Sequence, residues 1–278
     1  MKWKTKALLQ SVLSNIPVGE EIYFSLQKHF GGFKNFRVLS KVDQAINILQ
    51  ILKDNNIDIN NKRICEIGTG WVPIIPFMFY IFGQRSCTSF DVQRLLKPNL
   101  FIDAVKEITG LSDYFQRKIP WAWNEAAMKR LTVVSQHYPD CQTIFREMQF
   151  IYLAPVNTPF KDIPSDFIDI VVSNDTFEHI PRNDLANLLR SSREVMNPDG
   201  IAIHVIDCSD HYSHSDQSIS RINFLKFNES EWQKYNTRFL YQNRLRASDF
   251  RQMFKDGGFE IIDWRQKTSS DFPPSLSD

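Results

Sequence analysis

The chain has few cysteines and almost no net charge. Its four cysteines, Cys65, Cys87, Cys141 and Cys208, form no CxxC pair, and no histidine stands at zinc-finger spacing from them. We therefore expect reduced thiols in a cytoplasmic protein, and no bound metal. Lysine and arginine total 33 against 32 for aspartate and glutamate, a net charge of +1. This balance provides no overall field to attract nucleic acid, so we expect a small-molecule substrate.

Long hydrophobic runs, internal repeats and low-complexity tracts are missing as well. The longest apolar run, residues 72–83, has about a dozen residues, whereas a membrane-spanning helix needs about twenty. Near the N-terminus an apolar run at residues 7–9 follows lysines, but polar residues interrupt it and no small-residue cleavage site follows. The sequence thus predicts neither a membrane span nor a signal peptide.

The hydrophobic pattern divides the chain into an N-terminal helical extension, residues 1–60, and a larger domain, residues 61–278. Apolar residues recur at helical spacing across 45–52, and Gly31-Gly32 interrupt the extension. In the larger domain short apolar runs alternate with helical patterns, which predicts a doubly wound, mostly parallel α/β sheet. A helical insertion is expected at about 97–147. The expected strands are 63–67, 86–91, 149–154, 167–173, 201–207 and 259–264, and the other expected helices are 73–83, 183–196 and 248–256.

The strongest functional signal is a glycine turn directly after the first expected strand. The turn Gly68–Gly70 allows close approach of a ligand to the backbone, and the following helix would present unpaired amides. A dinucleotide-binding fingerprint needs a third glycine where this chain has Pro73. Glu66 would repel a pyrophosphate but attract the amino or sulfonium group of a cationic ligand. The turn therefore favours S-adenosylmethionine over NAD.

A second acid supports a nucleoside ligand. Asp91 ends the second expected strand, about twenty residues beyond the turn, where a carboxylate can bind both ribose hydroxyls. With Glu66-Ile67-Gly68-Thr69-Gly70, Asp91 and the segment 169–180, which reads DIVVSNDTFEHI, the chain resembles the class I S-adenosylmethionine-dependent methyltransferase family. The resemblance covers about residues 62–94 and 149–264 and implies a Rossmann-like fold.

By position, the resemblance also implies where the cofactor binds: at the glycine turn, the second-strand acid, the residues after the third strand and the end of the fourth. The implied residues are Glu66, Gly68, Thr69, Gly70, Asp91, Val92, Val156, Asn157, Ser173 and Asn174. Two features depart from the family pattern. The adenine-side position holds Asn157 where the family often has aspartate, and only a polar tail follows Trp264, where the family sheet usually ends in a hairpin.

Two histidines are candidate catalytic bases. His179 follows the fourth strand, where the resemblance places the methyl-transfer face, and His211 follows the fifth. Each could remove a proton from a substrate hydroxyl, or simply hold a loop in place. His211 belongs to a loose cluster with Asp207, Asp210, His214 and Asp216. This cluster could hold a divalent metal, but a polar loop is the favoured interpretation. The aromatic and arginine-rich stretch 232–246 is expected to be a packed cover.

The sequence thus predicts an S-adenosylmethionine-dependent methyltransferase that acts on an oxygen or nitrogen of an unidentified small-molecule or sugar acceptor. Two alternatives stay open: a catalytically silent S-adenosylmethionine-binding module, and an NAD(P)-dependent oxidoreductase on a related fold. The acceptor atom and the oligomeric state are not defined by the sequence.

Overall fold

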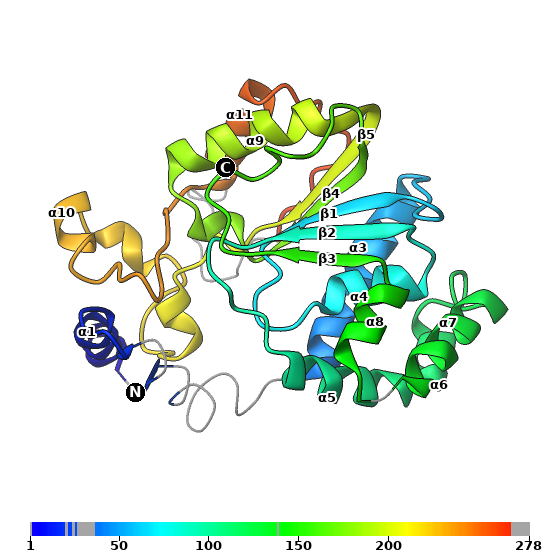
Figure 1. Ribbon diagram of the computed structural model, residues 1–278. Helices are drawn as coiled ribbons and strands as arrows, with labels where there is room; N and C mark the ends of the chain where they lie inside the picture. Colours follow the sequence, from blue (N-terminus) through cyan, green and yellow to red (C-terminus); the bar gives the residue numbers. More distant parts are fainter. Residues whose placement is uncertain (1, 20–21, 24–25, 27–36, 138, 268–278) are drawn as a thin grey trace. The chain divides into compact units, whose positions relative to one another are not determined.

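The computed structural model describes residues 2–19, 22–23, 26, 37–137 and 139–267 (Figure 1). The chain divides into two compact units, which are described in turn. Unit 1 comprises Met1–Phe36, Asp175–Arg190 and Ile206–Asp278, and unit 2 comprises Arg37–Asn174 and Ser191–Val205. Within the described residues no helix is long and apolar enough to cross a membrane.

Unit 2 is built on a five-stranded sheet in which all neighbouring strands run parallel. Its strands are β1 (Arg63–Ile67), β2 (Ser86–Phe90), β3 (Phe150–Leu153), β4 (Ile168–Asn174) and β5 (Met196–Val205), in the order β3-β2-β1-β4-β5. Four consecutive residues of β1 are buried, as expected of a central strand covered on both faces. The expected parallel α/β sheet is therefore confirmed. The strand order reverses direction at β1, between β2 and β4.

The helices of unit 2 form an apolar layer beside the sheet. They are α3 (Val38–Asp54), α4 (Ile74–Ile81), α5 (Pro98–Thr109), α6 (Ser112–Lys118), α7 (Glu125–Gln136) and α8 (Cys141–Glu147). Helix α3 packs on α4, and α4 and α5 both pack on α7. Edge-to-face aromatic contacts such as Phe77 with Phe101, whose ring centroids lie 5.8 Å apart, join these helices. The helical insertion expected at about 97–147 thus forms α5 to α8.

Unit 1 contains short helices around an aromatic core. Its elements are α1 (Trp3–Ser14), the 3-10 turns η1 (Phe177–His179), η2 (His211–His214) and η3 (Asn223–Lys226), α10 (Glu229–Trp232) and α11 (Ala247–Asp256). Trp3, Tyr212, Phe224 and Trp232 are buried together. The ring centroids of Trp3 and Tyr212 are 5.5 Å apart, and the Trp3 amide donates to Asp216 Oδ2 over 2.9 Å. From the stretch 232–246, Trp232 lies in this core, and Tyr235 and Leu240 pack against it.

The structure differs from the sequence expectations at two elements. Residues 259–264, expected as a last strand, form none; the Phe259 amide instead closes the end of α11 by donating to Phe254 O over 3.0 Å, and Ile262 is exposed. A short run rich in apolar residues does not make a strand where no ladder partner is available. Helix α9 (Arg182–Val195) ends as expected, but β5 begins at Met196, since Met196 pairs with Ile168 before a register shift. Gly31-Gly32 lie outside the described residues.

Candidate functional site

The glycine turn follows β1 and has the backbone that only glycine adopts easily. Gly68 and Gly70 have φ of +82° and +67°, in the left-handed region. The Gly68 amide donates to Phe90 O over 2.9 Å, which ties the turn to the end of β2. A Cβ placed on Gly70 would meet no atom within 4 Å. The outer side of the turn is therefore open to a ligand, and φ alone explains the glycine at position 70.

Glu66, the last but one residue of β1, is a buried carboxylate held by two hydroxyls. Thr69 Oγ1 donates to Glu66 Oε2 over 2.5 Å and Ser89 Oγ donates to the same atom over 3.1 Å. Burial raises the pKa of Glu66 to about 7; the Thr69 hydrogen bond opposes this rise and the nearby Asp91 adds to it. A cation placed beside this group would favour its ionised form.

Asp91 stands just beyond β2 and faces the same turn. The Gly70 amide donates to Asp91 Oδ2 over 3.1 Å, and Tyr152 Oη donates to Oδ2 over 2.9 Å. In the described part of the chain Oδ1 has no hydrogen bond, so it can still accept one from a ligand. Burial raises the pKa of Asp91 to about 6, against the opposing hydrogen bond from Tyr152. Sequence reasoning missed Tyr152, because only the register of β3 on β2 brings it opposite Ser89.

The other predicted cofactor residues lie at the same edge of the sheet in different settings. Ser173, at the end of β4, is fully buried and its Oγ lies 2.8 Å from His204 Nδ1; burial lowers the pKa of His204 to about 3, so this ring is neutral. Asn174 Nδ2 donates to Gln44 Oε1 over 3.2 Å. The remaining three are Val92 and Asn157, which are exposed, and Val156, whose amide donates to Asp91 O over 2.9 Å.

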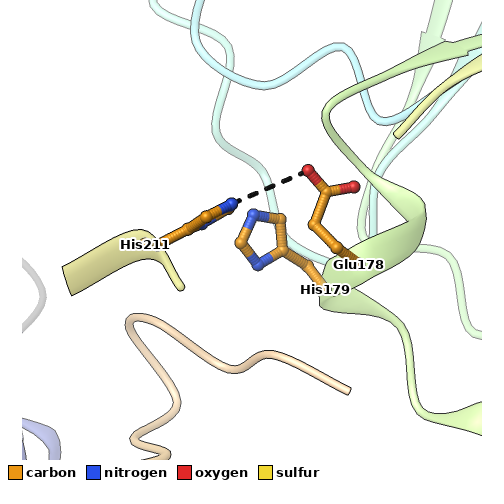
Figure 2. Close-up of side chains that lie close together, drawn as sticks. All are labelled: Glu178, His179 and His211. Carbon is orange, nitrogen blue, oxygen red and sulfur yellow. Dashed lines mark ion pairs between the residues drawn. The ribbon is translucent and has the colours of Figure 1, made fainter. Parts of the chain in front are cut away.

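Unit 1 brings together the two predicted bases and a carboxylate that sequence reasoning did not include. One possible ligand atom from each of Glu178, His179 and His211 lies within 4.8 Å of the other two (Figure 2). His211 Nε2 is 3.9 Å from Glu178 Oε1, and the rings of His179 and His211 are 4.8 Å apart. Glu178 follows β4, and only 2% of its surface is exposed. Nothing in the sequence around it predicts that this glutamate is buried.

The surroundings of this group are acidic and buried. Burial raises the pKa of Glu178 to about 8, and the charges of Asp175 and Asp207 add to the rise. Burial lowers the pKa of His179, although the hydrogen bond to Tyr241 opposes this. For Asp207, contacts from His211 and His214 outweigh burial and hold its pKa well below the usual range.

The loose polar cluster that the sequence indicates therefore separates in space. Asp207 and His214 stay near His211, with His214 Nε2 at 3.2 Å from Asp207 Oδ2. Asp210 instead accepts from the Tyr212 amide and Asn223, and Asp216 accepts from the Trp3 amide, so these two carboxylates hold the fold of unit 1.

Comparison with known proteins gives a match to a family model and matches to solved structures. A family model described as a methyltransferase domain matches residues 47–263. The curated proteins give no match. Among solved structures, a SAM-dependent methyltransferase from Leishmania major is 11% identical with a TM-score of 0.47, over 99% of this chain and 79% of that one. Cyclopropane synthase MmaA2 from Mycobacterium tuberculosis is 13% identical with a TM-score of 0.43, over 81% of this chain and 61% of that one.

A third solved structure, a candidate O-methyltransferase from Nostoc punctiforme, is 14% identical with a TM-score of 0.41. The alignment covers 79% of this chain and 51% of the other, so this chain spans about half the length of that protein. These three likenesses are too distant to bear on activity, whereas the family model covers most of the chain.

Proposed function

Because this chain belongs to the methyltransferase-domain family, we propose that it moves the methyl group of S-adenosylmethionine to an oxygen or nitrogen atom of a small-molecule or sugar acceptor. The observation that carries this proposal is the hydrogen-bonded group of Glu66, Thr69, Gly70 and Asp91. It stands at the carboxyl ends of β1 and β2, where the strand order reverses, and ligands of open α/β sheets bind at such points.

The donor set fits a cationic nucleoside better than a dinucleotide. Glu66 and Asp91 place two carboxylates at one turn, which favours an ammonium or sulfonium group and disfavours a pyrophosphate. Asp91 Oδ1 is available for a ribose hydroxyl, and the open side of Gly70 admits the ligand. When bound, S-adenosylmethionine supplies a methyl group on a sulfur that leaves readily, so this chain has to contribute chiefly orientation and the exclusion of water.

A hydroxyl acceptor also requires a base, and we propose His179 or His211 for this role. His179 Nδ1 lies 2.6 Å from Tyr241 O, and a carbonyl can only accept, so the proton of the ring sits on Nδ1. Nε2 then keeps its lone pair and is able to take a proton.

Binding of the cofactor is tested by equilibrium titration of the purified chain with S-adenosylhomocysteine and, separately, with NADH. We expect binding of the first and none of the second. Binding of NADH alone would refute the proposed function. Methyl transfer is then measured with S-adenosylmethionine and a panel of sugars and small hydroxylated metabolites, since a silent binding module would give binding without turnover.

The base is tested by His179→Ala and His211→Ala. The variant that lacks the base should bind S-adenosylhomocysteine as the unchanged chain does. Its rate of methyl transfer should fall, because a general base typically contributes about 10²–10⁴-fold to the rate. Full turnover in both variants would contradict the assignment.

A further inference from the structure

The group formed by Glu178, His179 and His211 has the side chains that bind metal ions, and two of its polar atoms are buried without a partner among the described residues. Glu178 Oε2 and His211 Nε2 are both buried without a hydrogen-bond partner in the described part of the chain. Native proteins rarely leave such atoms unpaired unless an ion, water or ligand satisfies them. In Figure 2 the other oxygen of the carboxylate, Glu178 Oε1, faces His211 Nε2, with His179 beside them; Oε1 accepts a hydrogen bond from the Asp207 amide over 3.4 Å.

The third side chain, His179, is oriented so that one ring nitrogen faces Glu178 and His211. His179 Nδ1 is taken by Tyr241 O at 2.6 Å, and Figure 2 shows the other ring nitrogen pointing toward Glu178 and His211. Histidines that bind metals commonly donate their second ring N–H to a backbone carbonyl or a carboxylate, which fixes the tautomer and the ring orientation. The hydrogen bond from His179 Nδ1 to Tyr241 O gives His179 this arrangement.

Three consecutive residues hold the two turns that carry the group. Tyr241 O binds His179, and Gln242 Oε1 accepts from the His211 amide over 2.9 Å. Asn243 Nδ2 donates to the carbonyls of Phe177 and Ile180, at 2.7 and 2.8 Å, and so fixes both ends of η1. The group is therefore positioned by hydrogen bonds from one short stretch of chain, as binding sites require.

We propose that Glu178, His179 and His211 bind one divalent transition-metal ion of the zinc or ferrous-iron class. Two imidazole nitrogens and one carboxylate suit these ions, while magnesium and calcium prefer sites made of oxygen alone. Ligands about 2.1 Å from a tetrahedral ion lie about 3.4 Å apart. The 3.9 Å from His211 Nε2 to Glu178 Oε1 needs only a small inward movement of two side chains.

A neighbouring acid supports the site without belonging to it. Asp207 Oδ2 is 3.6 Å from His211 Nε2, beyond hydrogen-bond distance, and is engaged by His214 at 3.2 Å. The second negative charge adds to the attraction for a cation. This inference does not depend on S-adenosylmethionine binding, but an imidazole Nε2 cannot bind an ion and accept a proton at once. For His179 and for His211 alike, the base and ligand roles are therefore alternatives that the metal experiment separates.

The test is metal titration of the full chain after treatment with a chelator. Zn²⁺ binding is followed by calorimetry and Co²⁺ binding by the visible absorption of the bound ion, with Mg²⁺ as the comparison. We expect one Zn²⁺ or Co²⁺ per chain and no comparable affinity for Mg²⁺. Absence of stoichiometric Zn²⁺ and Co²⁺ binding, or equal affinity for Mg²⁺, would overturn the proposal.

The ligands are tested by Glu178→Gln and His211→Phe, which preserve side-chain size. Each should weaken Zn²⁺ binding by more than about 100-fold, since even the loss of a supporting group costs 10- to 100-fold. The matched control is His137→Phe, which removes an imidazole from the end of α7 in unit 2 and should leave affinity unchanged. Asp207→Asn should retain one ion per chain. Unchanged affinity in the first two variants, or loss only in His137→Phe or Asp207→Asn, would refute the assignment; circular dichroism verifies that each variant is folded.

Discussion

Replacing Glu66 by glutamine tests the electrostatics of the glycine turn most directly. The pKa of Glu66 is about 7 in the folded chain, against 4.5 when unperturbed. Between these values the folded state holds the proton that the unfolded state has released, so stability falls as pH rises from about 4.5 to 7. Compared with a glutamate of unperturbed pKa, Glu66 lowers the free energy of unfolding by about 3 kcal/mol at pH 8. About 2–3 kcal/mol of this loss develops between pH 5 and pH 8. Glutamine keeps the size of the side chain and carries no charge to desolvate.

We therefore expect Glu66→Gln to be more stable than the unchanged chain at pH 8, by about 1–3 kcal/mol after the cost of an imperfectly paired amide, and to lose this advantage at pH 5. Urea unfolding at both pH values measures the difference. Glu107→Gln, the same change at an exposed position of α5, is the control and should show no such pH dependence. A stability difference between the unchanged chain and Glu66→Gln that is the same at pH 5 and pH 8 would refute the reasoning.

Three further outcomes are expected. Asp91→Ala should weaken S-adenosylhomocysteine binding at least about tenfold in titration, since it removes a charged hydrogen-bond acceptor; unchanged affinity would exclude the ribose role. Gly70→Ala should cost about 1 kcal/mol of unfolding free energy from its φ of +67° alone. Gly83→Ala should cost more, because its φ of +118° lies outside the left-handed region open to other residues and the Asn60 side chain would also have to move; the reverse order in urea unfolding would contradict this. Trp232→Ala should cost about 3–5 kcal/mol in the same assay, as the ring is 1% exposed, and a loss below about 1 kcal/mol would show that the ring adds little to the core.

The sheet of unit 2 could be predicted because its strands are short apolar runs separated by helical patterns and turn residues. The run at 63–67 and the glycine turn after it carry their own local signals, and β1 begins and ends where that run does. The expected strand at 259–264 shows the limit of such signals. A ladder needs a partner strand, and whether one is available is decided by tertiary structure that no local pattern contains.

The candidate cofactor site was predictable where the chemistry lies in the turn itself. Glu66 and Asp91 stand at strand ends, and the topology brings such ends to one edge. Tyr152 could not be found in this way, because its hydrogen bond to Asp91 depends on the register of β3 against β2. Glu178 lies in a segment that the sequence does single out, but whether a glutamate is buried and unpaired depends on packing around it.

The way in which Tyr241, Gln242 and Asn243 hold η1 and η2 has a consequence for how the protein can change. The two turns are far apart in the sequence, yet a single tripeptide makes hydrogen bonds to both of them. Deleting one residue there would shift all three anchors together and disperse Glu178, His179 and His211 without altering any of them. Exposed positions in the preceding connection, by contrast, can accept insertions as long as the tripeptide returns to the same place. Natural variation in loop length should therefore accumulate before residue 241 and stop at it.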